Sequence, residues 1–194
     1  ITGWKYKKTT NRINQKPIHF IVDNKDYILH ATSNSSAKLL ARNGTDRTIF
    51  KDKQSFTTPI HISENGTLYA ITSKNKLWIA YSNGITEVSE LPNLQSNSKI
   101  LAYDDGYYIS NGSSVSYINN MNEEESNIKL DAQVETLSLL QGYVTITTNN
   151  SLYLIRDNKI TEGFPIESKG HFNISDIDNN GKVNVVNIKK NAIY

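Results

Sequence analysis

Cysteine is absent from the sequence, and methionine and proline are scarce, with one and four copies among 194 residues. Without cysteine the chain has no disulfide framework, no thiolate metal site and no cysteine nucleophile. No apolar run approaches the roughly 20 residues that a membrane-spanning helix needs, and the hydrophobic share is 37%. The motifs G-x-S-x-G and H-E-x-x-H and the P-loop do not occur. These absences exclude a membrane-spanning helix and disfavour several common enzyme classes.

An excess of one charge is also missing, because 21 Lys and Arg face 19 Asp and Glu and the net charge is +2. No basic run is longer than two residues, so we expect no nucleic acid partner. The length suits one domain with a sizeable core. Because residue 1 is isoleucine rather than an initiator methionine, we expect a processed product or a part of a longer protein.

One short pattern recurs along the chain, namely a strand, a tight polar turn and a second strand. Apolar and polar residues alternate within each strand, which is typical of half-buried β-structure. The copies occupy 26–44, 66–84, 106–120, 142–158 and 181–194. Their turns contain Asn-Gly or Asp-Gly pairs that tolerate positive φ. These pairs are Asn43-Gly44, Asn65-Gly66, Asn83-Gly84, Asp105-Gly106, Asn111-Gly112 and Asn180-Gly181.

The repeat has a period near 40 residues, because Tyr27, Tyr69, Tyr108 and Tyr143 are 42, 39 and 35 residues apart. Such a period with about four strands per unit is typical of a β-propeller. The sequence therefore predicts an all-β propeller of about five four-stranded antiparallel blades in a single domain, 1–194. We expect the blades at 17–53, 58–91, 99–131, 135–166 and 171–194. The segment 131–142 has some helical character, but the repeat requires a strand in its second half.

The last blade is one strand short, whereas residues 1–9 form a strand pattern without a sheet of their own. We expect this N-terminal strand to complete the last blade, because an open set of blades leaves strand edges exposed. The alternative interpretation is that the chain is an excerpt from a longer propeller.

One turn offers a candidate ion site. Asp176, Asp178 and Asn180 alternate along it, Gly181 tightens it, and Asn184 follows. Calcium takes about six to eight oxygen ligands, which alternating side chains on a tight turn can supply. The alternative is a hairpin turn without metal.

The segment "GFPIESKGHFNISDIDNNGKVNVVNIKKNAIY" (163–194) resembles the FG-GAP and quinoprotein-like bacterial propeller repeats, in which a D-x-D-x-N-G turn joins two strands. The unit at 17–44 is similar in outline. The resemblance implies a propeller fold and a bound calcium. The implied ligands are Asp176, Asp178, Asn180, Asn184 and the backbone carbonyl of Lys182. Asparagine stands at 180 and 184, where the family usually has an acidic residue, and this lowers the expected affinity for calcium.

Three further sets of residues have both a structural and a functional interpretation. His19, His61 and His171 fall early in predicted inner strands, where three imidazoles can hold a transition metal, but strand histidines are more often simply hydrogen-bonded. Acids near the inner strands can serve a glycosidase or lie in turns; they are Asp23, Asp104 and Asp176. Aromatic residues can stack on sugars or peptides, or pack in the core; they are Trp4, Tyr6, Trp78, Tyr81, Tyr107 and Tyr108.

The function that we favour is a non-enzymatic binding or scaffolding module with a protein or glycan ligand. Propellers bind at loops and at the channel mouth, and the loops 92–98, 119–127 and 163–170 are candidates. The resemblance and the missing cysteine predict a bacterial, extracytoplasmic location, in the periplasm or at the cell surface. Two alternatives stay open. One is a glycan-active or quinoprotein-type enzyme with its site at the channel mouth, and the other is a calcium-stabilised structural repeat.

Overall fold

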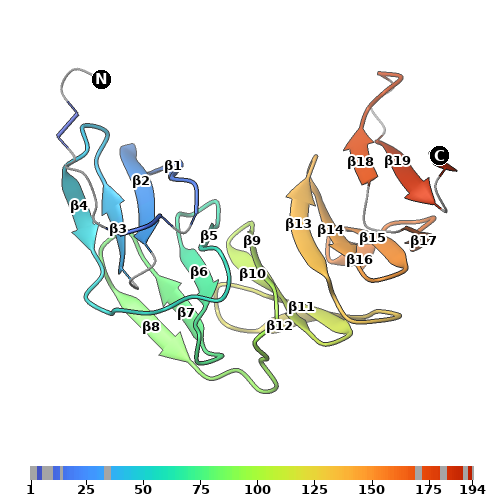
Figure 1. Ribbon diagram of the computed structural model, residues 1–194, viewed down its shortest axis with the longest axis horizontal. Coiled ribbons are helices and arrows are strands. Elements are labelled where there is room, and N and C mark those ends of the chain that lie inside the picture. Colours follow the sequence, from blue (N-terminus) through green and yellow to red (C-terminus); the bar gives the residue numbers. More distant parts are fainter. Residues whose placement is uncertain are drawn as a thin grey trace. The chain divides into compact units, whose positions relative to one another are not determined.

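The computed structural model describes residues 4–5, 11–13, 15–32, 36–168, 172–179, 183–189 and 192–193. All regular elements within these ranges are β-strands (Figure 1). None of the described segments is a helix long and apolar enough to cross a membrane.

The first two sheets are four-stranded antiparallel meanders whose strands follow one another in chain order. The first sheet contains β1 (Ile18–Val22), β2 (Lys25–Thr32), β3 (Ser36–Leu40) and β4 (Asp46–Ile49). The second contains β5 (His61–Ile62), β6 (Leu68–Ile71), β7 (Leu77–Ala80) and β8 (Thr86–Ser89).

The later sheets repeat this arrangement with small changes. The third contains β9 (Ile100–Tyr103), β10 (Gly106–Asn111), β11 (Ser114–Ile118) and β12 (Glu124–Lys129). The fourth contains β13 (Thr136–Leu140), β14 (Tyr143–Thr147), β15 (Ser151–Arg156) and β16 (Lys159–Ile160), and β17 (Ile166–Glu167) also pairs with β15. The fifth contains β18 (Phe172–Ser175), β19 (Asn184–Lys189) and β20 (Ala192–Ile193).

These sheets confirm the predicted all-β chain of four-stranded antiparallel units. The ambiguous segment 131–142 is not helical, and its second half forms β13, as the repeat required. Of the N-terminal strand expected to complete the last blade, residues 1–3 and 6–9 lie outside the described residues. Lys5 donates its backbone N–H to the carbonyl of Asn43 at 2.8 Å, in the turn between β3 and β4.

The chain divides into two compact units. The first unit contains residues 1–97 and 102–107, and the second contains residues 98–101 and 108–194. The division passes between Tyr107 and Tyr108 on β10. Tyr107 lies 4.8 Å from Tyr69, centroid to centroid, in the first unit, and Tyr108 lies 5.0 Å from Tyr117 in the second. Neighbouring residues of a strand point to opposite faces, which explains why each tyrosine joins a different core.

The first unit has one core, in which one face of the first sheet packs against one face of the second. Trp78 on β7 is its largest buried side chain. The ring of Phe50 meets the Trp78 ring edge-on at 5.4 Å, and Phe56 lies at 5.0 Å. Four small residues belong to the same core, and they are Ala31, Ala37, Ala70 and Ala80. The alternation of large and small side chains lets two twisted sheets pack without voids.

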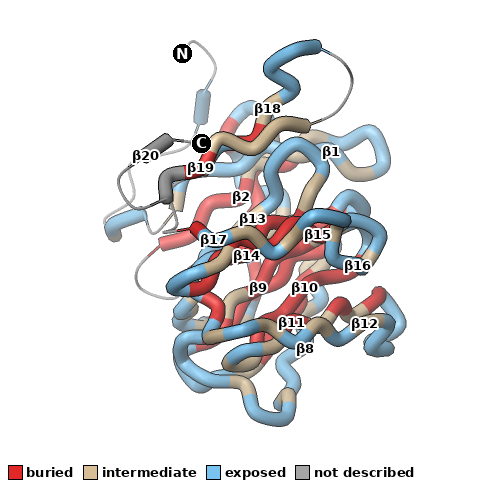
Figure 2. The backbone as a smooth tube through the Cα atoms, turned by 90° about the vertical axis from the view of Figure 1, so that its right-hand side faces the viewer, coloured by how far each residue is buried: buried red, intermediate tan, exposed pale blue. Residues whose placement is uncertain are grey.

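The second unit buries a comparable cluster between the fourth and fifth sheets. Leu152 and Leu154 on β15 and Ile174 on β18 are buried, and Phe164 and Phe172 pack against them. Figure 2 shows the same pattern along β14 and β15, which are mostly buried, whereas the turn between β15 and β16 is exposed.

The predicted turn glycines lie where positive φ is needed. Gly44, Gly66, Gly84 and Gly112 all have φ between 59° and 94°. The Asp105-Gly106 pair differs, because the positive φ falls on Asp104 (48°) and Gly106 begins β10. Gly181 lies outside the described residues. Gly66 is special because a Cβ there would lie 2.1 Å from Cγ2 of Val22 on β1, whereas a Cβ on Gly112 would meet nothing within 4 Å.

We therefore expect Gly66→Ala to destabilise the protein more than Gly112→Ala. Both substitutions put a side chain at positive φ, which costs about 1 kcal/mol. Only Gly66→Ala adds a steric overlap between the first two sheets, and we expect a total loss of about 3 kcal/mol. Urea unfolding of both variants measures the difference, and equal losses would contradict the close approach of Gly66 to Val22.

Asp131 fastens the segment after β12 to the hairpin of β14 and β15. Its carboxylate accepts hydrogen bonds from Thr148 Oγ1 at 2.9 Å and from Ser151 Oγ, and its backbone N–H donates to the Tyr153 hydroxyl at 3.0 Å. Burial alone would raise the pKa of Asp131, but the hydrogen bonds from Ser151, Thr148 and Tyr153 outweigh it and lower the pKa. The folded protein therefore stabilises the charged form of the Asp131 carboxylate relative to the neutral form.

A lowered pKa in the folded state means that this stabilisation is present above the ordinary aspartate pKa and is lost as the pH falls through the folded value. We expect Asp131→Asn to cost about 1 kcal/mol at pH 7, and the gap to wild type should close toward pH 3. Thermal unfolding at several pH values measures this gap, with Asp157→Asn in the β15–β16 turn as the control. A gap that does not change with pH would refute the role of the charge.

Candidate functional site

The first unit carries a cleft of about 330 Å³. Gln15, Ala31 and residues 56–60 line it. None of these residues was singled out from the sequence. The cleft combines apolar groups, an amide and two hydroxyls, and it carries no titratable side chain among these lining residues.

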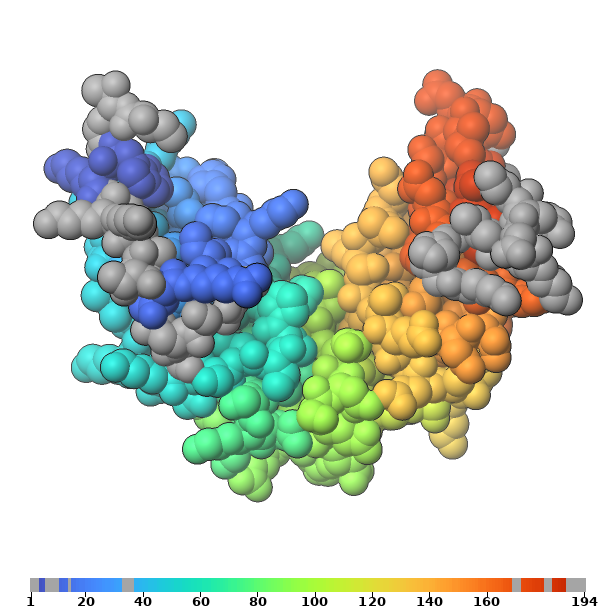
Figure 3. All heavy atoms as spheres, in the orientation of Figure 1, coloured from blue at the N-terminus to red at the C-terminus, as the bar shows by residue number. Residues whose placement is uncertain are grey.

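The topology of the sheets explains why these segments meet. In a four-stranded antiparallel meander, the first strand begins at the same edge where the fourth strand ends and where the second strand meets the third. The segment before β1 and the connection from β4 to β5 therefore lie at the same end of the strands of the first sheet, which we call the cleft edge. Figure 3 shows the connection (cyan) lying across the first unit on the side turned to the viewer, close to residues 15–20 (blue).

The inner strands of both sheets are interrupted in the same way at this edge. Ile13 bridges Thr32 and Ile18 pairs with Leu29. The chain therefore advances five residues before β1 while the paired part of β2 advances three, which leaves two extra residues. Phe56 bridges Thr72 and His61 pairs with Tyr69, with the same two extra residues. Each interruption contains a proline, which cannot donate to a ladder. The repeated "PIH" at 17–19 and 59–61 is the sequence signal for this feature.

Hydrogen bonds hold the interrupted segments in place. Gln15 donates from Nε2 to the carbonyl of Ile60 at 3.2 Å and accepts the Ile60 N–H at Oε1 at 2.7 Å. The N–H of Thr57 donates to the carbonyl of Ile71 at 2.8 Å, and Thr58 Oγ1 accepts the N–H of Ile71 at 2.9 Å. The side chain of Gln15 thus replaces a strand neighbour and holds the backbone of Ile60 in the cleft wall.

The histidines of the first unit lie in separate environments. His19 Nε2 lies 2.6 Å from Asp26 Oδ1 on the neighbouring strand. Burial lowers the pKa of His61, and burial together with the Lys38 ammonium lowers the pKa of His30. His171 lies outside the described residues. Within the described part of the chain, no three His, Asp or Glu side chains gather where they could hold a metal ion.

The inner-strand acids lie in turns. Asp23 and Asp104 occupy the turns that follow β1 and β9, with φ of 49° and 48°. Asp176 follows β18 and is exposed. All three positions agree with the interpretation that these acids lie in the turns after inner strands.

The predicted calcium turn is described in part. Asp176 and Asp178 are exposed between β18 and β19, and Asn184 begins β19. Asn184 Oδ1 accepts the backbone N–H of Ile177 at 2.9 Å, so the amide oxygen expected to bind calcium here closes the turn. Asn180 and Lys182 lie outside the described residues. The calcium site stays a prediction.

If this turn binds calcium, the melting temperature rises in calcium relative to a chelator, because a ligand that binds only the folded state stabilises it. Asp176→Asn/Asp178→Asn should abolish the rise, since it removes both carboxylates. Differential scanning calorimetry in millimolar calcium and in EGTA makes the comparison. Equal melting temperatures for the wild type would remove the calcium site.

The aromatic candidates are mainly core residues. Trp78, Tyr107 and Tyr108 are each only 1% exposed, Tyr81 is half-buried and Trp4 is exposed. Tyr6 lies outside the described residues. Packing therefore explains the three buried rings. Of the candidate loops, 92–98 joins β8 to β9, 119–127 includes the start of β12, and 163–170 contains β17.

Solved structures with similar sheets include three propeller proteins. BamB from Moraxella catarrhalis is 17% identical, with a TM-score of 0.53, and the match covers 77% of this chain and 52% of BamB. PorZ from Porphyromonas gingivalis is 15% identical, with a TM-score of 0.52, covering 77% of this chain and 20% of PorZ. The Pan2 WD40 domain from Neurospora crassa is 12% identical, with a TM-score of 0.52, covering 78% and 52%.

The chain spans about half the length of BamB and of the Pan2 domain and a fifth of PorZ. Comparison with known protein families and with curated proteins gives no match. The finer resemblance to FG-GAP and quinoprotein-like repeats stays a prediction. Identities this low establish the fold alone, and the chain accordingly is an all-β protein with the β-propeller fold.

Proposed function

We propose that this chain is a non-enzymatic binding module of the bacterial cell envelope, and that the cleft of the first unit receives a side chain of a protein ligand. The observation that carries this proposal is the preformed cleft edge. Propellers host binding, scaffolding and catalytic functions alike, so the site and not the fold indicates the function.

The chemistry of the lining favours binding over catalysis. General acid–base catalysis needs titratable groups within reach of the substrate, and the described lining residues of the cleft contain none. The amide of Gln15 is already bonded to the backbone of Ile60. Such a site holds a ligand by shape and by burial of apolar surface, with little cost for ordering its walls.

The size of the cleft favours a side chain over a large ligand. At about 330 Å³ it lies at the lower end of small-molecule pockets, which range from about 300 to 1,000 Å³. Phe56, Pro59 and Ile60 supply apolar walls, and Phe56 is held from behind by the ring of Trp78. An aliphatic or aromatic side chain of a partner protein fits this lining better than a sugar, which would need more free hydrogen-bonding groups.

The envelope location draws on two of the similar structures. PorZ is a bacterial surface component of a secretion system, and BamB also comes from a bacterium. The resemblance of 163–194 to bacterial propeller repeats and the missing cysteine support the same proposal.

The test uses peptides of the form Gly-Ser-Xaa-Ser-Gly with Xaa as Phe, Trp, Leu or Ser, added to ¹⁵N-labelled protein. We expect the apolar peptides to shift the amide signals of Thr57, Thr58 and Ile60, because their side chains enter the cleft. Thr57→Trp should abolish the shifts by filling the cleft. Thr45→Trp, in the β3–β4 turn at the opposite edge of the first sheet, should leave them unchanged.

Two outcomes would contradict the proposal. In one, no apolar peptide moves these amides at millimolar concentration. In the other, a panel of oligosaccharides moves them and the peptides do not, which would identify a glycan site instead.

A further inference from the structure

We infer that the ligand of this cleft is an acidic protein segment, in which carboxylates flank the apolar side chain that enters the cleft. The inference rests on the proposed function and adds the chemistry of the partner. It comes from the charges around the cleft edge.

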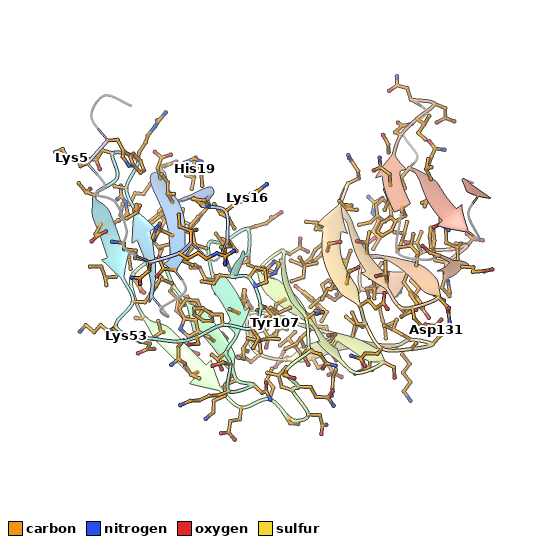
Figure 4. The ribbon with its side chains drawn as sticks, in the orientation of Figure 1. Lys5, Lys16, His19, Lys53, Tyr107 and Asp131 are labelled. Atoms are coloured by element: carbon orange, nitrogen blue, oxygen red, sulfur yellow. The ribbon has the colours of Figure 1, made fainter. Side chains whose placement is uncertain are left out.

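Four exposed cations lie on the two segments that form the cleft edge. Arg12 and Lys16 belong to the segment before β1, where Lys16 directly follows the lining residue Gln15. Lys51 and Lys53 belong to the connection that continues into lining residues 56–60. Figure 4 shows Lys16 just before β1 and Lys53 on the β4–β5 connection, with both side chains projecting outward. Exposed cations therefore lie on both segments that supply lining residues to the cleft.

Nearby acids cancel only part of this charge, because Asp52 lies between Lys51 and Lys53 and keeps its negative charge when it accepts a hydrogen bond from a neutral hydroxyl. Residues 1–53 contain eleven Lys and Arg but only four Asp, whereas the rest of the chain has an acidic excess. Asp46 pairs with Lys38 at 2.8 Å, and Asp26 lies against His19. Asp52 accepts a hydrogen bond from Thr86 Oγ1. Asp23 lies in the β1–β2 turn, at the edge opposite the cleft.

The geometry separates a peptide from a membrane. A lipid surface is broad and flat. It would meet the four exposed cations of the cleft edge, which we call the rim cations, but it would leave the recessed walls of the cleft without contacts. An extended peptide can place one side chain among Phe56, Pro59 and Ile60 while its neighbours reach the rim. Acidic neighbours would meet Lys16 and Lys53, and rim charges of this kind act on association rate and specificity.

Exposed charges are screened by salt, with a Debye length of about 8 Å at physiological ionic strength. The rim should therefore matter most at low salt. The apolar contact inside the cleft should be less sensitive. This difference allows the two parts of the site to be measured separately.

The experiment compares Ac-Glu-Glu-Phe-Glu-Glu-NH₂ with Ac-Gln-Gln-Phe-Gln-Gln-NH₂ by titration into the ¹⁵N-labelled chain. We expect the acidic peptide to bind about tenfold more tightly in 50 mM salt and the advantage to shrink below about threefold in 500 mM salt. Lys16→Glu/Lys53→Glu should remove the advantage. The control Lys25→Glu/Arg42→Glu makes the same charge change at the opposite edge of the first sheet and should keep it.

Each result separates this inference from the proposed function. Equal affinity of both peptides, with shifts at Thr57, Thr58 and Ile60, would overturn the acidic partner and leave the cleft as a binding site. No shift at these amides with either peptide would overturn both. Vesicles of phosphatidylglycerol and phosphatidylcholine that bind through Lys16 and Lys53, while the acidic peptide does not, would identify a membrane surface and overturn the inference.

Discussion

The packing of one face of the first sheet against one face of the second governs the first unit. A single four-stranded sheet leaves both faces open to water, and it becomes stable only when a face is covered. Here the coverage centres on Trp78, whose ring contacts the rings of Phe50 and Phe56 and whose core also contains alanines of both sheets. Phe56 belongs to the connection between the sheets, so the interaction that joins the two sheets also fixes one wall of the cleft.

The cleft follows from a second constraint, the proline in each interrupted inner strand. Pro17 and Pro59 cannot donate to a ladder, so the chain departs from regular pairing and returns to it after two extra residues. The backbone groups released in this way still need partners. Gln15 supplies both partners for Ile60, and Thr58 supplies one for Ile71. These hydrogen bonds satisfy the backbone groups of the cleft walls and hold them to neighbouring strands.

The repeat could be predicted from the sequence because a period of two, a spacing near 40 and turn-forming pairs are local signals. Gly66 and Gly84 lie in turns as expected, and Asp104 takes the positive φ expected at its neighbours because the turn is one residue earlier. The cleft could not be found in this way, since the bond from Gln15 to Ile60 joins residues 45 apart. The "PIH" copies at 17–19 and 59–61 mark the two interrupted strands, but the pattern of apolar residues does not distinguish an interrupted strand from a regular one. The calcium turn stays a prediction, and Asn184, one of its expected ligands, accepts a hydrogen bond from the backbone N–H of Ile177.

The central claim is that Gln15 preforms the cleft, and hydrogen exchange at the Ile60 amide tests it most directly. If the claim is right, this amide exchanges slowly in the wild type, and Gln15→Ala accelerates it while the amide of Ile71, which bonds to Thr58 Oγ1, stays protected. If the Ile60 amide exchanges in the wild type as fast as in an unstructured peptide, the cleft is not preformed and the account of the site is wrong.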